Sequence, residues 1–153
     1  MNKIATNVEQ SKELLELGID PNTASMFWAH LNTKNKDKNS GEIISVLHVL
    51  ESRSMSSFEE IEKCQSDCVS FSPAWSFIEL IELLPSEFTD KRFSRGALVD
   101  GENYYLVIDK TSISYCPKND NDGYIIRETL NNGESLIDVA VRVIKILKEG
   151  KIF

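Results

Sequence analysis

Two turn signals in the C-terminal half constrain the fold of this chain more than any other feature. Asp100-Gly101 and Asn121-Asp122-Gly123 are typical of tight hairpin turns, because Asp, Asn and Gly tolerate the backbone angles that such turns need. Strand-like segments flank both turns; they are residues 92–99, 103–109, 112–116 and 124–128. The sequence therefore predicts an antiparallel meander of three or four strands.

Residues 134–149 predict a final helix. Its polar side chains recur along a single stripe, and the remaining positions are almost all apolar. The stripe consists of Ser135, Asp138, Arg142, Lys145 and Glu149, with an expected Asp138–Arg142 pair one helical turn apart. A helix with one narrow polar stripe buries the rest of its surface, so we expect it to pack on the sheet.

The N-terminal segment predicts a hairpin of two helices. Residues 8–17 form the first, with Gly18 as a natural C-terminal cap. Asp20-Pro21 is typical of a helix start, since Asp is a preferred N-cap and Pro is favoured at the first helical position. The apolar stripe of the second helix would be Ala24, Phe27, Trp28 and Leu31.

The middle of the chain predicts a loop, a strand and further helices. Residues 32–41 are polar and predict an exposed loop, and the branched apolar residues 43–50 predict a strand. A helix is expected from Ser56 or Ser57 to about Cys68. Ser72-Pro73 is interpreted as the cap of another helix over residues 74–84, which Pro85 ends. Together these elements predict a single α+β domain over residues 1–153.

Charge is unevenly distributed along the chain. With 17 basic and 24 acidic residues among 153, the formal charge is −7. Residues 43–90 contain two basic and nine acidic side chains, whereas the flanking parts are close to neutral. Such a chain is a poor general binder of nucleic acid or anionic lipid. No apolar run approaches the length of a membrane span, and no secretory leader is expected, so the predicted location is the cytoplasm.

Three segments resemble a known group of proteins. They read EQSKELLELGIDPNTA at 9–24, PAWSFIELIELLP at 73–85 and ESLIDVA at 134–140. The chain resembles a family of small bacterial proteins often found in phage-like or other mobile elements. That family has no established activity, so the resemblance implies a bacterial cytoplasmic setting and no catalytic residues.

The acidic middle segment predicts a partner-binding surface. An acidic surface steers association with a basic protein, and the chain shows no phosphate-binding glycine loop, nucleophile elbow or zinc-protease motif. We therefore predict a small accessory protein without catalysis that binds a protein partner, with an enzyme as a weaker reading. The predicted contact residues are Glu59, Glu60, Glu62, Asp67, Glu79 and Glu82.

A DNA-binding accessory protein is the alternative. The N-terminal hairpin has the spacing of a helix-turn-helix, which would place Asn22, Thr23 and Ser25 in the major groove. Lys34, Lys36 and Lys38 would then contact phosphates. The second helix contains no Arg, Lys or Gln, the side chains that most often read bases, so this alternative is the weaker one.

The cysteines and histidines predict neither a metal site nor a cofactor. Cys64 and Cys68 are one helical turn apart, but Cys116, His30 and His48 are scattered along the chain. Zinc needs four ligands, usually in closer pairs, so the cysteines are interpreted as small buried side chains. Each histidine is interpreted as a packed or hydrogen-bonded residue.

Overall fold

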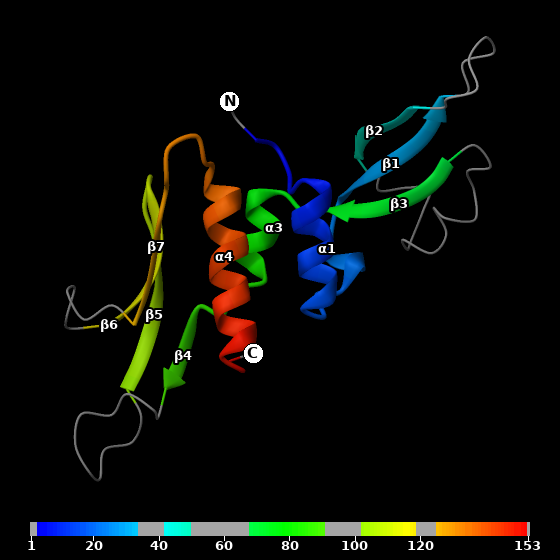
Figure 1. Cartoon of the computed structure of the whole chain (residues 1–153). Helices are drawn as coiled ribbons and strands as arrows, with labels where there is room; N and C mark the ends of the chain where they lie inside the picture. Colours follow the sequence, from blue (N-terminus) through cyan, green and yellow to red (C-terminus); the bar gives the residue numbers. More distant parts are fainter. Residues whose placement is uncertain (1–2, 34–41, 50–67, 91–101, 119–124, 153) are drawn as a thin grey trace. The chain divides into compact units, whose positions relative to one another are not determined.

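The computed structural model describes residues 3–33, 42–49, 68–90, 102–118 and 125–152 (Figure 1). These residues form an α+β protein, as predicted. They group into two compact units, Ile4–Glu79 and Leu80–Phe153 with Met1–Lys3, which are called the N-terminal and C-terminal units below. That residues 1–153 make one domain stays a prediction.

The first helix of the N-terminal unit is the one predicted. α1 spans Val8–Glu16 and begins with a capping box. Asn7 Oδ1 accepts the Gln10 backbone N–H at 2.8 Å, and Gln10 Oε1 accepts the Asn7 N–H at 3.1 Å. Gly18, with a φ of +78°, lets the chain turn away after the helix, because this angle is strained for other residues.

The predicted second helix is wrong, and with it the N-terminal helical hairpin. Asp20 and Pro21 do start a helix, but it is a single 3-10 turn, η1, over Pro21–Thr23. The chain then continues as strand β1, Met26–Thr33. Of the apolar stripe that predicted a helix, Phe27, Trp28 and Leu31 belong instead to this strand, which has neighbours on both sides, and the aromatic residues favour that conformation. Ala24 ends the 3-10 turn.

β1 is the central strand of a three-stranded sheet in the order β2-β1-β3. β2 spans Glu42–Val49 and confirms the predicted strand, and β3 spans Cys68–Ala74. Both pair antiparallel with β1, so β2 and β3 run parallel to each other. The predicted loop at 32–41 begins too early, because Asn32 and Thr33 belong to β1, and its residues 34–41 lie outside the described residues. Most of the predicted helix before Cys68 also lies outside them.

The predicted helix start at Ser72-Pro73 is also wrong, because both residues belong to β3. Proline has no backbone N–H, but it is tolerated on an edge strand because the outer side of that strand donates no hydrogen bond to a neighbouring strand. The helix of this segment, α3, is shorter and spans Phe77–Glu82.

A buried polar network joins the two ends of the N-terminal unit. Thr6 is fully buried, and its Oγ1 accepts the Trp75 backbone N–H at 3.0 Å and lies 2.9 Å from Ser11 Oγ. The wholly buried Trp75 indole donates to Thr23 Oγ1 at 2.9 Å. Ala5 also bridges to Ser76, so residues 5–6 are tied to residues 75–76.

The C-terminal unit contains the predicted meander. Its four strands lie in chain order, β4-β5-β6-β7, and each pairs antiparallel with the next. They span Glu87–Asp90, Glu102–Ile108, Ser112–Pro117 and Ile126–Thr129. The predicted strand at 92–99 and both predicted turns lie outside the described residues, and β4 was not predicted.

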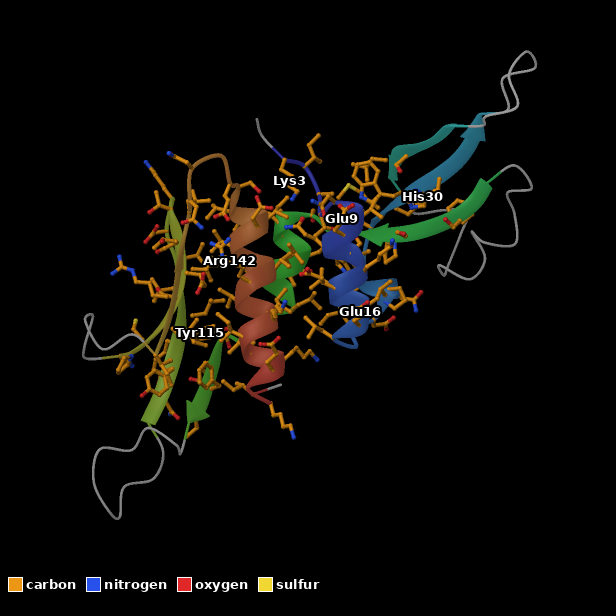
Figure 2. All side chains as sticks on the ribbon, in the orientation of Figure 1. Lys3, Glu9, Glu16, His30, Tyr115 and Arg142 are labelled. Atoms are coloured by element: carbon orange, nitrogen blue, oxygen red, sulfur yellow. The ribbon has the colours of Figure 1, made fainter. Side chains whose placement is uncertain are left out.

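The last helix packs on this sheet, as predicted. α4 spans Leu136–Glu149 and contacts β6 and β7 (Figure 1). Seven of its apolar side chains are buried: Ile137, Val139, Ala140, Val141, Val143, Ile144 and Leu147. On the same side of the sheet, Phe88 contacts the rings of Tyr104 and Tyr115. Burial raises the pKa of Tyr115, whose hydroxyl donates to the Pro85 carbonyl at 2.7 Å (Figure 2).

Candidate functional site

Glu79, one of the predicted partner-contact residues, is used by the fold itself. Its Oε2 accepts the Ser76 backbone N–H at 2.6 Å, and its Oε1 accepts the Ser25 backbone N–H at 2.7 Å. The carboxylate therefore caps α3 and ties it to the segment before β1. Such a role needs no partner, so we remove Glu79 from the contact set.

The other predicted contact residues are not all placed. Glu82 lies on α3 and is exposed. Glu59, Glu60, Glu62 and Asp67 lie outside the described residues. The structure therefore does not bring the predicted acidic residues together as a described cluster, and they remain a prediction.

The residues predicted to read DNA bases serve the 3-10 turn instead. Asn22 donates from its backbone and side chain to Asp20 Oδ1, at 2.9 and 3.0 Å. The Thr23 hydroxyl donates to the Asp20 carbonyl at 2.7 Å and accepts from Trp75. Ser25 is exposed, and its backbone N–H is bound to Glu79. The three lysines of the alternative lie outside the described residues.

His30 lies at the centre of a small polar cluster that spans all three strands of the sheet (Figure 2). Its Nδ1 lies 2.8 Å from Ser45 Oγ on β2, and its Nε2 lies 3.3 Å from Ser72 Oγ on β3. This confirms that His30 is a hydrogen-bonded residue. The two serines were not predicted, since they are 15 and 42 residues away and only the strand pairing brings them to His30.

The cluster has hydroxyl–imidazole contacts of the kind that nucleophilic catalysis uses. Serine hydrolysis also requires donors that stabilise an oxyanion, and these must converge on the attacked carbonyl. Neither serine is beside a helix start or a turn that would present such donors, because both lie within paired strands. The cluster is therefore best explained as hydrogen bonding between neighbouring strands.

The cysteines do not form a described metal site. Cys68 is the first residue of β3, Cys116 is buried in β6, and Cys64 lies outside the described residues. Within the described ranges, no group of three His, Cys, Asp or Glu side chains is arranged to hold a metal ion.

Arg142 organises a charge network in the C-terminal unit (Figure 2). Its guanidinium donates to Glu128 at 2.9 Å, to Glu134 at 2.7 Å and to the Thr129 carbonyl at 2.8 Å. The Asn131 backbone N–H and then Arg142 hold the pKa of Glu134 below its ordinary value. Asp138, the residue predicted to pair with Arg142, accepts from Lys3 Nζ at 2.7 Å and from the Ser135 N–H. The network fixes α4 to β7 and is structural.

Comparisons with protein-family models, with curated proteins and with solved structures gave no match. The resemblance to small proteins of bacterial mobile elements therefore stays a prediction. In the described residues, no helix is long and apolar enough to cross a membrane.

Proposed function

We propose that this protein is a small cytoplasmic accessory protein without catalytic activity, which binds a basic protein partner through its acidic middle segment. The observation that carries the proposal is the charge distribution. Residues 43–90 contain nine acidic and two basic side chains, while the rest of the chain is nearly neutral. Acidic surfaces of this kind accelerate encounter with cationic partners and disfavour anionic ones.

The strand arrangement supports a contact region in the chain segment that connects β2 to β3 in the sequence. Val49, the last residue of β2, lies opposite Met26 of β1, whereas Cys68, the first residue of β3, lies opposite Leu31. The segment between them, which contains five of the nine acidic residues of 43–90, is therefore anchored at opposite ends of one sheet. The proposed contact residues are Glu59, Glu60, Glu62, Asp67 and Glu82.

DNA binding is not proposed as a second function. The alternative rested on a second helix that would enter the major groove, and the structure has a 3-10 turn and a strand there. Retention of the protein on duplex DNA at low salt, with a steep loss as salt rises, would argue for nucleic acid and against our proposal.

The test is a titration of the isotope-labelled protein with a short oligolysine peptide, followed by amide NMR signals. We expect shifts within residues 43–90 and a binding constant that weakens as salt rises. Replacing Glu59, Glu60 and Glu62 together with Gln should weaken binding about tenfold at low salt, since each exposed pair contributes up to about 1 kcal/mol.

The matched control removes the same charge elsewhere. Glu9, Glu13 and Glu16 of α1 are all exposed, and Figure 2 labels the first and last of them. Their replacement with Gln should change the affinity by no more than about twofold, because their contacts lie outside the proposed surface. Equal losses from both triple variants would show diffuse attraction to net charge and would contradict the proposal.

A further inference from the structure

The four outer strands of the two sheets differ in how their free edges are protected. An exposed edge strand pairs readily with other chains, and proteins prevent this with short strands, prolines, charged side chains or irregular register. β4 and β7 are four residues long, and each includes charged residues. β3 contains Pro73 and has a register shift where it passes His30 and Leu31 of β1.

β2 lacks most of these protections. It is eight residues long, contains no proline, and pairs with β1 in an unbroken register from Glu42 to Val49. Its single charged residue, Glu42, is at one end, and most of the others are branched apolar residues that favour strands. Among the residues that the structure describes, no strand lies on its outer side (Figure 1).

We propose that the outer edge of β2 pairs with β2 of a second copy of this chain, antiparallel and centred on Ser45. A twofold axis normal to the sheet leaves each side chain on the same face of the sheet in both copies. Because side chains alternate between the two faces along a strand, residues that lie opposite each other must be an even number of positions apart in the sequence. Centring on Ser45 places Ile44 opposite Val46, Ile43 opposite Leu47 and Glu42 opposite His48 of the other copy.

This register makes the strand complementary to itself. Apolar residues face apolar residues, the acidic residue faces a histidine, and two small hydroxyl residues meet at the axis, so no like charges oppose each other. Centring on Val46 instead places Ile44 opposite His48 and leaves Glu42 without an opposite residue in the strand. Self-complementarity identifies the occupant of the edge as a second copy and joins two three-stranded sheets into one of six strands.

The inference goes beyond the proposed function and does not rest on it. A dimer of this kind presents two copies of the acidic segment, whether or not that segment binds a basic partner. Loss of dimerisation and loss of oligolysine binding are measured separately, so either proposal can fail alone.

The test is the solution mass by light scattering after size exclusion, supported by sedimentation equilibrium. We expect twice the 17.3 kDa of one chain. Ser45 is exposed, so Ser45→Lys and Ser45→Glu introduce a charge that the surface tolerates. Each variant alone places like charges opposite each other at the axis and should be monomeric at the concentration where the wild type is dimeric.

An equal mixture of Ser45→Lys and Ser45→Glu should recover the dimer, because the charges then attract. Both variants lose the same Ser45–His30 hydrogen bond, so recovery cannot come from that contact. Ser70→Lys is the control on the opposite edge strand, since Ser70 is also exposed and lies in β3, and it should remain dimeric. A mixture that stays monomeric, or a Ser70→Lys variant that dissociates, overturns the proposal.

A second measurement uses only the wild-type chain, in case the variants fold poorly. On dilution through the dissociation range, the amides of β2 should exchange with solvent faster, while those of β3 keep their rate. A monomeric mass at every concentration, or equal changes in both strands, overturns the proposal.

Discussion

At the scale of residues, several carboxylates of this protein accept backbone N–H groups. Asp20, Glu79, Asp109, Glu134 and Asp138 each bind at least one such group near a turn or helix start. A carboxylate held in this way orders the local backbone and is partly neutralised by the N–H dipoles. Of these five carboxylates, only Glu79 lies within residues 43–90, the segment proposed to bind a partner.

Glu79→Gln should lower the free energy of unfolding by about 1–2 kcal/mol, because two backbone N–H groups lose their charged acceptor. Glu82→Gln, on the same helix and exposed, should change it by less than about 0.5 kcal/mol. Urea unfolding of both variants and the wild type measures the difference. Equal stability of the two variants would contradict the capping role of Glu79.

We expect Asp109 to make the free energy of unfolding depend on pH in the acidic range. Hydrogen bonds from the Ser112 hydroxyl, and from the backbone and side chain of Thr111, lower the pKa of Asp109 from 3.8 to about 2. Because folding depresses the pKa of Asp109, its carboxylate contributes to the free energy of unfolding in full above pH 3.8. This contribution is lost as the pH falls toward about 2.

Urea unfolding across this range should show Asp109→Asn to be less stable than the wild type near neutral pH, with the difference shrinking as the solution becomes more acidic. Glu149→Gln removes the same charge from an exposed position at the end of α4 and controls for net charge. A difference that is independent of pH would show that Asp109 does not contribute through its charge.

At the scale of elements, Arg142 connects α4 to Glu128 and the Thr129 carbonyl of β7, and also to Glu134, which precedes the helix. Arg142→Lys keeps the charge but loses the planar fork, and we expect it to lower the free energy of unfolding by about 1–2 kcal/mol. Lys145→Ala, at an exposed position of the same helix, should have an effect of less than about 0.5 kcal/mol. Thermal or urea unfolding that ranks the two variants in reverse would contradict this role.

Elements with local signals were predicted from the sequence, and elements decided by distant partners were not. α1 and α4 have caps and periodic apolar faces, and β5 to β7 have alternating residues beside turns. The conformation of these elements is therefore determined by residues close to them in the sequence. The caps Asp20-Pro21 and Ser72-Pro73 led to two incorrect helix predictions. A favourable cap indicates where a helix can begin, but it does not determine whether the helix extends. β1 and β3 form strands because they pair with each other across some forty residues.

The candidate site was predictable to a smaller extent than the fold. Glu79 was selected for its charge, yet its partner Ser25 is 54 residues away and no sequence pattern connects the two. The serines that bind His30 are likewise brought to it only by strand register. The uneven charge, in contrast, is a property of the sequence itself and needs no structure.

At the scale of the whole molecule, the prediction of a single domain can be tested because natural probes separate the two units. Both tryptophans, Trp28 and Trp75, belong to the N-terminal unit, whereas α4 belongs to the C-terminal unit. We expect urea unfolding followed by tryptophan fluorescence and by the native amide NMR signals of α4 to give the same midpoint. Two separate midpoints would show that the units unfold as independent domains.

The pairing of Thr6 with Trp75 has a consequence for a chain that is still being synthesised. Trp75 is 69 residues beyond Thr6, so the backbone N–H that the buried Thr6 hydroxyl accepts does not exist until Trp75 has been synthesised. Until then α1 is a nine-residue helix, which is too short to be stable in water by itself. The native surroundings of Thr6 therefore form only after Trp75 has been synthesised.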